Sequence, residues 1–201
     1  MIKCPYMYRK DKKDEYYTRK AKQEGYPARS VYKLKEIDEK YKIFKKGDLV
    51  LDLGCAPGSW LKYISEKIGE NGKVIGVDLN EKKIPLAKNI IFIQKDIFQL
   101  GKDDFIKKFN AVVSDLSPKT SGIKFADETA SLDLAEKAFE LAKMFLKAGG
   151  NFICKIFEGG LADNFFKEVK KEFRSAKLFR PKAVIKGSRE IYIIGKDFLH
   201  K

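Results

Sequence analysis

Three aspartates and one lysine lie in or directly after short apolar runs, where charged groups are uncommon. Asp78 is in KVIGVDL (73–79), Asp96 ends IIFIQKD (90–96), Asp115 is in AVVSDLS (111–117), and Lys155 interrupts FICKIF (152–157). Burying an unpaired ammonium group costs several kcal/mol. Lys155 therefore either extends its head to water along its aliphatic stem or belongs to a polar site built at strand ends.

A glycine-containing turn precedes these residues and points to a nucleoside ligand. DLGCAPGSW (52–60) has glycines at 54 and 58, which allow the backbone to approach a ligand closely. The dinucleotide fingerprint G-x-G-x-x-G is absent from this turn, because Pro57 and the spacing break it. Asp78 follows Gly54 by 24 residues, and its carboxylate can accept both hydroxyls of a ribose, while Asp96 can meet an adenine edge.

Acidic groups at successive strand ends would repel a cofactor that carries phosphate but suit a cationic nucleoside. S-adenosyl-L-methionine, a sulfonium with an amino acid tail, is therefore the predicted cofactor, with S-adenosyl-L-homocysteine as its product. The competing interpretation is structural: aspartates at strand ends often cap helices, and Trp60 at a helix start often serves packing.

The elements that would position these residues alternate along the chain. Apolar runs at 49–54, 73–79, 90–96, 111–117 and 151–157 predict strands, and helical patterns separate them at SWLKYISEKI, EKKIPLAK, KDDFIKKF and DETASLDLAEKAFELAKMFLKAGG. LADNFFKEVKKEF predicts a further helix, and KLFRPKAV and SREIYIIG predict an antiparallel hairpin at the sheet edge. We expect a Rossmann-like α/β fold with a mostly parallel seven-stranded sheet, one antiparallel edge strand and helices on both faces.

The first quarter of the chain differs from the rest in charge and in aromatic content. The 201 residues carry a net charge of +14, and residues 1–46 hold fifteen Lys or Arg against seven Asp or Glu, with seven of the nine tyrosines. Cations neutralise phosphates and aromatic rings stack on unpaired bases, so this composition favours RNA as a partner. A solvated basic surface is the alternative. Residues 1–25 are polar and unpatterned, whereas 28–44 predict an amphipathic helix.

Other features narrow the class of protein. No apolar run is long enough to span a membrane and the first ten residues lack a signal-peptide core, so we expect a soluble, cytoplasmic protein with no membrane contact. Cys4, Cys55 and Cys154 are predicted to be free thiols, and with His200 as the sole histidine we expect no metal site. The length predicts one domain over 1–201, with 1–46 as a basic extension and helix, and we expect a monomer.

Motifs across nearly the whole chain resemble the FtsJ/RrmJ family of ribose 2′-O-methyltransferases. They are ARSVYKLKEID (28–38), DLGCAPGSW, VIGVDL, IQKDI, VVSDLSPKTSG (112–122), FICKIFEGG (152–160) and SREIYIIG (188–195). The resemblance implies a catalytic tetrad of Lys33, Asp115, Lys155 and Glu190. It also implies cofactor binding by Gly58 and Trp60 at the methionine end, Asp78 at the ribose, Asp96 at the adenine and Asp115 near the acceptor. Ser59 departs from the pattern, because a second glycine commonly follows Pro-Gly.

Transfer of a methyl group to a ribose hydroxyl requires positioning and loss of the hydroxyl proton. Lys155 can act as the general base if it is neutral, which burial and the neighbouring Lys33 favour, or it can position the hydroxyl as an ammonium, which Asp115 and Glu190 favour. Both roles remain open from the sequence.

The acceptor implied by the resemblance is a uridine in large-subunit ribosomal RNA, free or within the large ribosomal subunit. A tRNA anticodon loop is the alternative, and a non-enzymatic RNA-binding protein with the same fold is a more remote one. A NAD-dependent reductase is disfavoured by the missing G-x-G-x-x-G. Residues 1–46 form the predicted RNA surface together with a second basic group, namely Lys167, Lys170, Lys171, Arg174, Arg180, Lys182 and Lys186.

Overall fold

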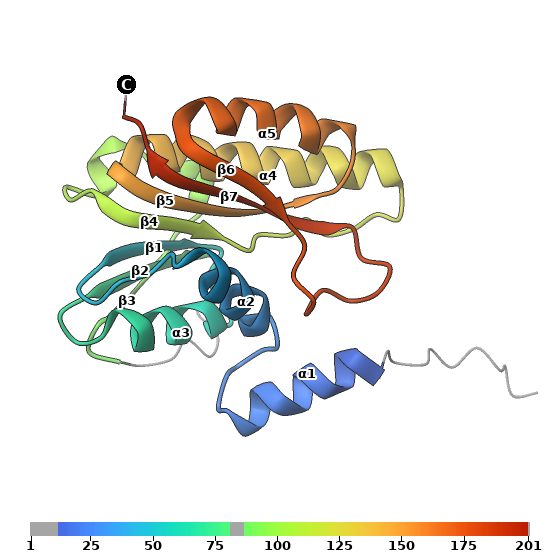
Figure 1. The fold of residues 1–201 in the computed structure, drawn as a ribbon, viewed down its shortest axis with the longest axis horizontal. Helices are drawn as coiled ribbons and strands as arrows, with labels where there is room; N and C mark the ends of the chain where they lie inside the picture. The colour runs from blue at the N-terminus through green and yellow to red at the C-terminus, as the bar shows by residue number, and fades with distance from the viewer. Residues whose placement is uncertain (1–11, 81–86, 201) are drawn as a thin grey trace, which may run out of the picture.

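The computed structural model describes residues 12–80 and 87–200, and within them seven strands form one sheet (Figure 1). The strand order is β3-β2-β1-β4-β5-β7-β6. The bounds are β1 Leu49–Leu53, β2 Lys73–Asp78, β3 Ile90–Gln94, β4 Phe109–Ser114, β5 Leu146–Phe157, β6 Phe173–Phe179 and β7 Glu190–Phe198. β1 to β5 pair in parallel, and β7 runs antiparallel to β5 and β6. The predicted fold class is confirmed, with β6 and β7 as antiparallel neighbours. The strand predicted at KLFRPKAV (177–184) was wrong in its bounds: β6 is Phe173–Phe179 and ends before Pro181, which has no N–H for a sheet hydrogen bond.

Helices cover both faces of the sheet, as a parallel sheet requires. In Figure 1, α2 (Val31–Tyr41) and α3 (Ser59–Ile68) lie below the sheet, and α4 (Lys124–Phe145) and α5 (Gly160–Glu172) lie above it. Each face has its own core, with Leu34 and Ile64 below and Phe139 and Val169 above, all buried. Two 3₁₀ turns, η1 (Ile97–Gln99) and η2 (Lys102–Asp104), complete the connections.

Helix α1 (Lys12–Gln23) was not predicted, because its sequence lacks an apolar stripe. It contacts the body of the protein through a few side chains: Ala21 is buried, and the ring centroid of Tyr17 lies 5.1 Å from that of Tyr32 on α2. Such a contact leaves no helical periodicity of apolar residues in the sequence. Residues 1–11, which the polar N-terminal prediction also covered, lie outside the described residues.

Two helical predictions were wrong in part, and one cannot be compared. KDDFIKKF (102–109) forms only η2, after which Ile106 is exposed and β4 begins at Phe109. The long helix ends at Phe145 rather than extending toward Gly150, since Leu146 already pairs with Phe109 in the sheet. EKKIPLAK lies mostly in 81–86, outside the described residues. No helix within 12–80 and 87–200 is long and apolar enough to cross a membrane.

Candidate active site

A cavity of about 540 Å³ opens where β1, β2 and β4 end. Parallel strands bring their carboxyl ends to one edge of the sheet, the place where open α/β sheets bind ligands. The predicted residues Asp78, Asp96 and Asp115 all line this cavity. The other lining residues are Gly54, Ala56, Leu79, Asn80, Lys95, Ile97, Phe98, Leu116, Ser117, Lys119 and Leu134.

Backbone amides hold the carboxylates of Asp78 and Asp96 in place. The Ala56 N–H donates to Oδ2 of Asp78 at 2.9 Å, and the Asn80 N–H donates to its Oδ1 at 2.8 Å. Asp96 caps η1, because its Oδ1 accepts the N–H of Phe98 at 3.0 Å. The capping interpretation of Asp96 is therefore correct, and the same bond fixes its carboxylate at the cavity.

Gly54 lines the cavity and also leaves room for a packed side chain. Its φ of 75° lies in the left-handed region, and a Cβ there would stand 2.2 Å from Cδ2 of Leu116. The space beside this glycine is filled by a packed side chain, so Gly54 allows the turn and the packing of Leu116. Gly58, with φ of 92°, begins α3 and does not line the cavity.

Asp52, at the end of β1, adds a buried acid that sequence reasoning did not assign to the site. Its Oδ2 has no hydrogen-bond partner within the described residues. Burial raises the pKa of the Asp52 carboxyl well above its usual value, and the negative charges of Asp115 and Asp78 raise it further. The raised pKa favours the neutral form of Asp52, so the negative potential at the cavity comes from Asp78 and Asp115.

These features fit S-adenosyl-L-methionine. The negative potential favours a sulfonium, and the fixed carboxylate of Asp78 suits the two hydroxyls of a ribose. Leu79 and Phe98 expose apolar surface at the cavity, at 61% and 53% of their areas, which suits a planar base beside Asp96.

Lys155 lies at the end of β5, buried, and contacts Asp115. Its Nζ donates to the main-chain oxygen of Asp115 at 2.8 Å and lies 3.4 Å from Oδ1 of the same residue. Asp115 also lines the cavity, so one residue joins the cavity to the lysine. The head of Lys155 does not reach open water, because only 4% of its side chain is exposed.

Tyr192 on β7 completes this contact and was missed by sequence reasoning. Its register partner is Lys155, and its hydroxyl donates to Oδ1 of Asp115 at 2.7 Å. Burial, Asp115 and Glu190 raise the pKa of the fully buried Tyr192 phenol well above its usual value, so it remains a neutral donor. The sequence could have indicated Tyr192 as a site residue, because it lies two positions after Glu190 and alternate residues of a strand share a face.

Lys33 and Glu190 form the second ion pair of the tetrad. Nζ of Lys33, on α2, lies 2.7 Å from Oε2 of Glu190, at the start of β7. Lys33 is buried, and a fifth of the Glu190 side chain is exposed. The four residues thus come together as two pairs, with Glu190 and Tyr192 on the same face of β7.

Trp60 lies beneath the start of α2 rather than in the cavity lining. It is buried, its indole N–H donates to the main-chain oxygen of Ser30 at 3.0 Å, and its ring centroid lies 6.1 Å from that of Tyr192. The neighbouring Ser59 accepts the N–H of Ala28 on its Oγ at 2.6 Å. Within the described residues, no group of acidic, histidine or cysteine side chains is arranged to hold a metal ion.

A Rossmann-like sheet with an acidic nucleoside cavity and a lysine beside it defines an S-adenosylmethionine-dependent methyltransferase. The profile of the FtsJ-like methyltransferase family matches residues 26–198, and the chain belongs to that family. It is 48% identical to ribosomal RNA large subunit methyltransferase E of Desulfatibacillum aliphaticivorans over 90% of this chain and 89% of the relative. The protein of the same name from Bdellovibrio bacteriovorus is 45% identical over 90% and 95%.

Solved structures agree with this membership. A protein assigned as a ribosomal RNA methyltransferase from Plasmodium falciparum superposes with a TM-score of 0.74 at 31% identity, covering 88% of this chain and all of that one. A SAM-dependent O-methyltransferase from Thermotoga maritima, at 14% identity, has a TM-score of 0.58 over 83% of this chain and 65% of its own, and shares the fold.

Proposed function

We propose that this protein methylates the 2′-hydroxyl of a uridine ribose in large-subunit ribosomal RNA, with S-adenosyl-L-methionine as the methyl donor. The observation that carries the proposal is the position of Asp115, which lines the nucleoside cavity and contacts Lys155. A hydroxyl bound at Lys155 would lie next to Asp115, the residue that the lysine shares with the cavity. The class of RNA substrate is inferred from the two relatives named above, because their shared name specifies ribosomal RNA rather than tRNA.

The chain's own residues position the acceptor and handle its proton. The bond to the Asp115 main-chain oxygen uses one N–H of Lys155, and the Asp115 carboxylate lies near a second. The Asp115 carboxylate favours the ammonium form of Lys155. In this proposal Lys155 loses that proton before transfer, after which its two contacts leave the lone pair for the hydroxyl proton and Lys155 acts as the general base. Lys33 supplies a second cation close to the start of β7, and Glu190 holds it there.

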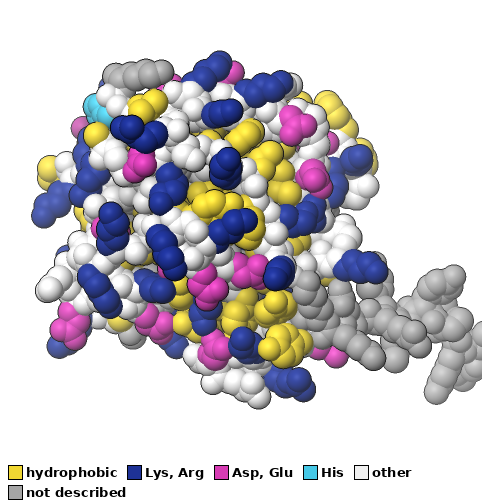
Figure 2. Space-filling view, viewed as in Figure 1, with side chains coloured by type: hydrophobic (Ala, Val, Ile, Leu, Met, Phe, Trp, Pro, Cys, Tyr) yellow, Lys and Arg dark blue, Asp and Glu magenta, His cyan; other side chains and the backbone are white. Residues whose placement is uncertain are grey.

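The fold separates the basic residues of the RNA surface that was predicted from the sequence. Figure 2 shows Lys and Arg side chains across the face in view, with acidic side chains among them. α5, which carries Lys167, Lys170 and Lys171, covers the sheet face opposite α2 (Figure 1). We therefore leave α5 out of the RNA surface and retain α1, α2 and the segment 180–186, which adjoins α2.

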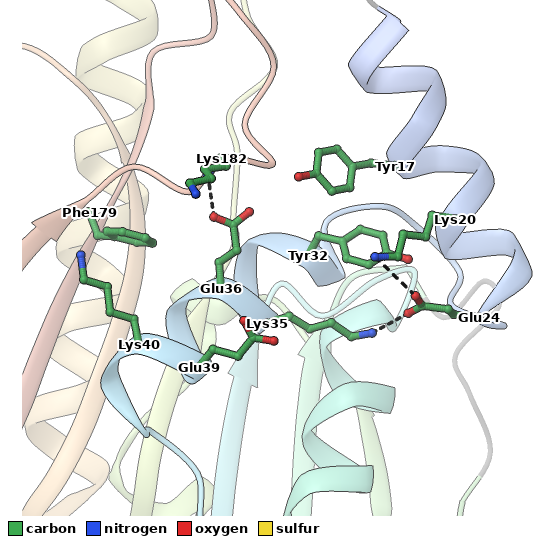
Figure 3. Close-up of a pocket in the computed structure, with 10 residues that line it drawn as sticks. All are labelled: Tyr17, Lys20, Glu24, Tyr32, Lys35, Glu36, Glu39, Lys40, Phe179 and Lys182. Atoms are coloured by element: carbon green, nitrogen blue, oxygen red, sulfur yellow. Dashed lines mark hydrogen bonds and ion pairs between the residues drawn. The ribbon is translucent and has the colours of Figure 1, made fainter.

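A groove of about 660 Å³ lies on this restricted surface (Figure 3). Tyr17 and Tyr32 lie on one side of it and Phe179 on the other. Nζ of Lys40 is 4.5 Å from the centre of the Phe179 ring, and Lys182 also lines the groove. Aromatic rings and cations together bind unpaired nucleotides.

Two of the glutamates in the groove are bound to groups of the protein itself. Glu24 pairs with Lys35 at 2.6 Å. Glu36 accepts the N–H groups of Lys182 and Ala183 at 2.7 and 2.9 Å. Repulsion of RNA phosphates by these carboxylates is reduced accordingly, and we expect RNA binding that weakens steeply as salt rises.

The test is methyl transfer from labelled S-adenosyl-L-methionine to three RNA samples in parallel: unmodified large ribosomal subunits, free ribosomal RNA and tRNA. We expect label on one ribose 2′-oxygen of the ribosomal RNA and none on tRNA. Lys155→Ala should abolish transfer. Lys137→Ala is the matched control, because Lys137 pairs with Glu140 at 3.1 Å on α4, and it should retain activity. Label on a base, or on tRNA alone, would contradict the proposal.

The role of Lys155 as base has its own measurement, the single-turnover rate as a function of pH. We expect the rate to rise with pH through one ionisation that belongs to Lys155. A rate without that ionisation, combined with an inactive Lys155→Ala variant, would instead make Lys155 a positioning group. Lys155→Arg should be inactive under either role, because a guanidinium does not deprotonate and has a different shape.

A further inference from the structure

Two exposed apolar side chains follow the loop that leads from Asp115 to α4. Ile123 and Phe125, at the start of α4, expose 66% and 72% of their areas. Neither belongs to either of the two buried cores. Isolated exposed apolar residues are ordinary, but an exposed aromatic ring one loop away from a reacting group is a candidate contact for a ligand. We call residues 123–125 the α4 patch.

The α4 patch is held rigidly in place. The carboxylate of Asp127, which is buried, accepts the N–H of Ser121 at 2.6 Å, the hydroxyl of Ser121 at 2.8 Å and the N–H of Gly122 at 3.3 Å. The Ile123 N–H donates to Oγ of Ser121 at 3.2 Å. A surface that is ordered before its ligand arrives loses less entropy on binding.

The patch adjoins the strand that carries Glu190. Arg189, the residue before Glu190, donates from Nη2 to the main-chain oxygen of Lys124 at 3.3 Å. Its guanidinium also lies 5.4 Å from the ring centre of Phe157, two residues after Lys155. The loop that leads from Asp115 at the end of β4 ends at this patch. The α4 patch is therefore at the edge of the sheet where the acceptor ribose must lie.

We propose that Phe125, supported by Ile123, is a stacking platform for an unpaired base next to the nucleotide being methylated. This inference rests on the proposed function, because it assumes an RNA acceptor. Two lysines favour RNA, because Lys124 is part of the patch and Lys119 lies on the loop before it. Arg189 contacts the patch but pairs with Glu128 at 3.7 Å, so its charge is partly compensated. Aromatic side chains bind unpaired bases by stacking on their faces, and flanking cations neutralise the phosphates between them.

The platform would limit methylation to riboses that lie next to an unpaired base. A 2′-hydroxyl is present on every nucleotide, so Lys155 and Asp115 alone distinguish none of them. A base stacked on Phe125 fixes the register of the strand, and the adjacent ribose then lies at Lys155. Stacking accepts any base, so the platform selects an unpaired neighbour rather than a particular sequence.

The experiment measures both binding and methyl transfer for three substitutions at one position. Phe125→Ala and Phe125→Leu remove the ring, and Phe125→Tyr keeps it. Ile106→Ala is the matched control, since Ile106 is almost fully exposed and precedes β4, at the opposite end of the sheet. Binding is read from quenching of 2-aminopurine placed on either side of the target uridine in a large-subunit RNA fragment, so it does not depend on transfer.

We expect Phe125→Ala and Phe125→Leu to weaken RNA binding and to raise the KM for RNA about tenfold, within the loss that removal of one stacking ring causes. Phe125→Tyr and Ile106→Ala should resemble the wild type, and quenching should occur on one side of the target only. An abasic nucleotide on that side should remove the difference between wild type and Phe125→Ala.

Three results would overturn the platform or separate it from the proposed function. Unchanged binding and KM in Phe125→Ala would overturn it. A defect seen with assembled large subunits but absent with free RNA would also overturn it, because the patch would then contact a protein. One-sided quenching that depends on Phe125, without methyl transfer by the wild type, would retain the platform and reject the proposed function.

Discussion

Tyr192→Phe removes one hydroxyl from the active site and leaves the ring in place. The lost bond, from the Tyr192 hydroxyl to Oδ1 of Asp115 at 2.7 Å, joins a neutral donor to a carboxylate. Hydrogen bonds to charged groups contribute about 1.5–3 kcal/mol. Water can replace part of the lost bond because 18% of the Asp115 side chain is exposed, so we expect the lower value. About 1.5 kcal/mol corresponds to roughly a tenfold lower kcat.

The assay is steady-state methyl transfer with saturating cofactor, accompanied by urea denaturation. We expect kcat to fall and the KM for RNA to stay within about twofold, because Tyr192 is buried and reaches the reaction only through Asp115. Tyr63→Phe is the matched control: this buried tyrosine on α3 also donates to an aspartate, Oδ2 of Asp38, at 2.8 Å. It should lose comparable stability and keep its kcat.

One result would refute the positioning role of Tyr192. If Tyr192→Phe and Tyr63→Phe lose similar stability and both retain wild-type kcat, the Tyr192 hydroxyl stabilises the fold and does not orient Asp115 for catalysis.

Three further substitutions test individual contacts. In urea denaturation, the free energy of unfolding of Asp52→Asn should increase relative to that of the wild type as pH rises from 4 to 8. Because the folded pKa of the Asp52 carboxyl is raised, the wild type loses stability once this group ionises in the unfolded chain. Equal pH slopes for the two proteins would contradict this. Gly54→Ala should destabilise by about 1–3 kcal/mol more than Gly47→Ala, which has a similar positive φ but no atom within 4 Å of the new Cβ; equal losses would contradict the clash with Leu116. Lys33→Met should lower kcat and reduce stability by about 1–3 kcal/mol, because Glu190 loses its partner. Lys35→Met is the control: its ion pair is more exposed, so it should reduce stability by under about 1 kcal/mol and keep kcat. Equal effects of the two substitutions would refute a role for Lys33 in the active site.

The sheet was predictable because each parallel strand is buried on both faces and so appears as an apolar run. Residues 49–54 and 73–79 each match their strand to within one residue. α1 and the segment after η2 were not predictable, because what decides their structure is a few tertiary contacts. Tyr17 contacts Tyr32 across 14 intervening residues, and nothing in the local sequence indicates this contact.

The residue types of the site were also predictable, since Asp78, Asp96 and Asp115 do line one cavity and Lys155 does meet Asp115. The pairing of Lys33 with Glu190 was not. Which acid binds which lysine depends on the register of β5 against β7, where Lys155 faces Tyr192 and Phe157 faces Glu190. A shift of two residues would place Glu190 opposite Lys155, and sequence composition does not distinguish the two registers.

Ser59, which stands where a second glycine commonly follows Pro-Gly, makes a hydrogen bond that a glycine could not make. A glycine at this position has no side-chain oxygen, but Oγ of Ser59 accepts the N–H of Ala28, and the indole of the next residue, Trp60, donates to the oxygen of Ser30. The start of α3, directly after the cofactor turn, therefore holds the segment that leads into α2. Lys33 lies in the first turn of α2 and reaches Glu190 from there. The residues after Pro-Gly thus connect the turn that lines the cavity to the helix that carries Lys33, and Trp60 makes this connection from outside the cavity.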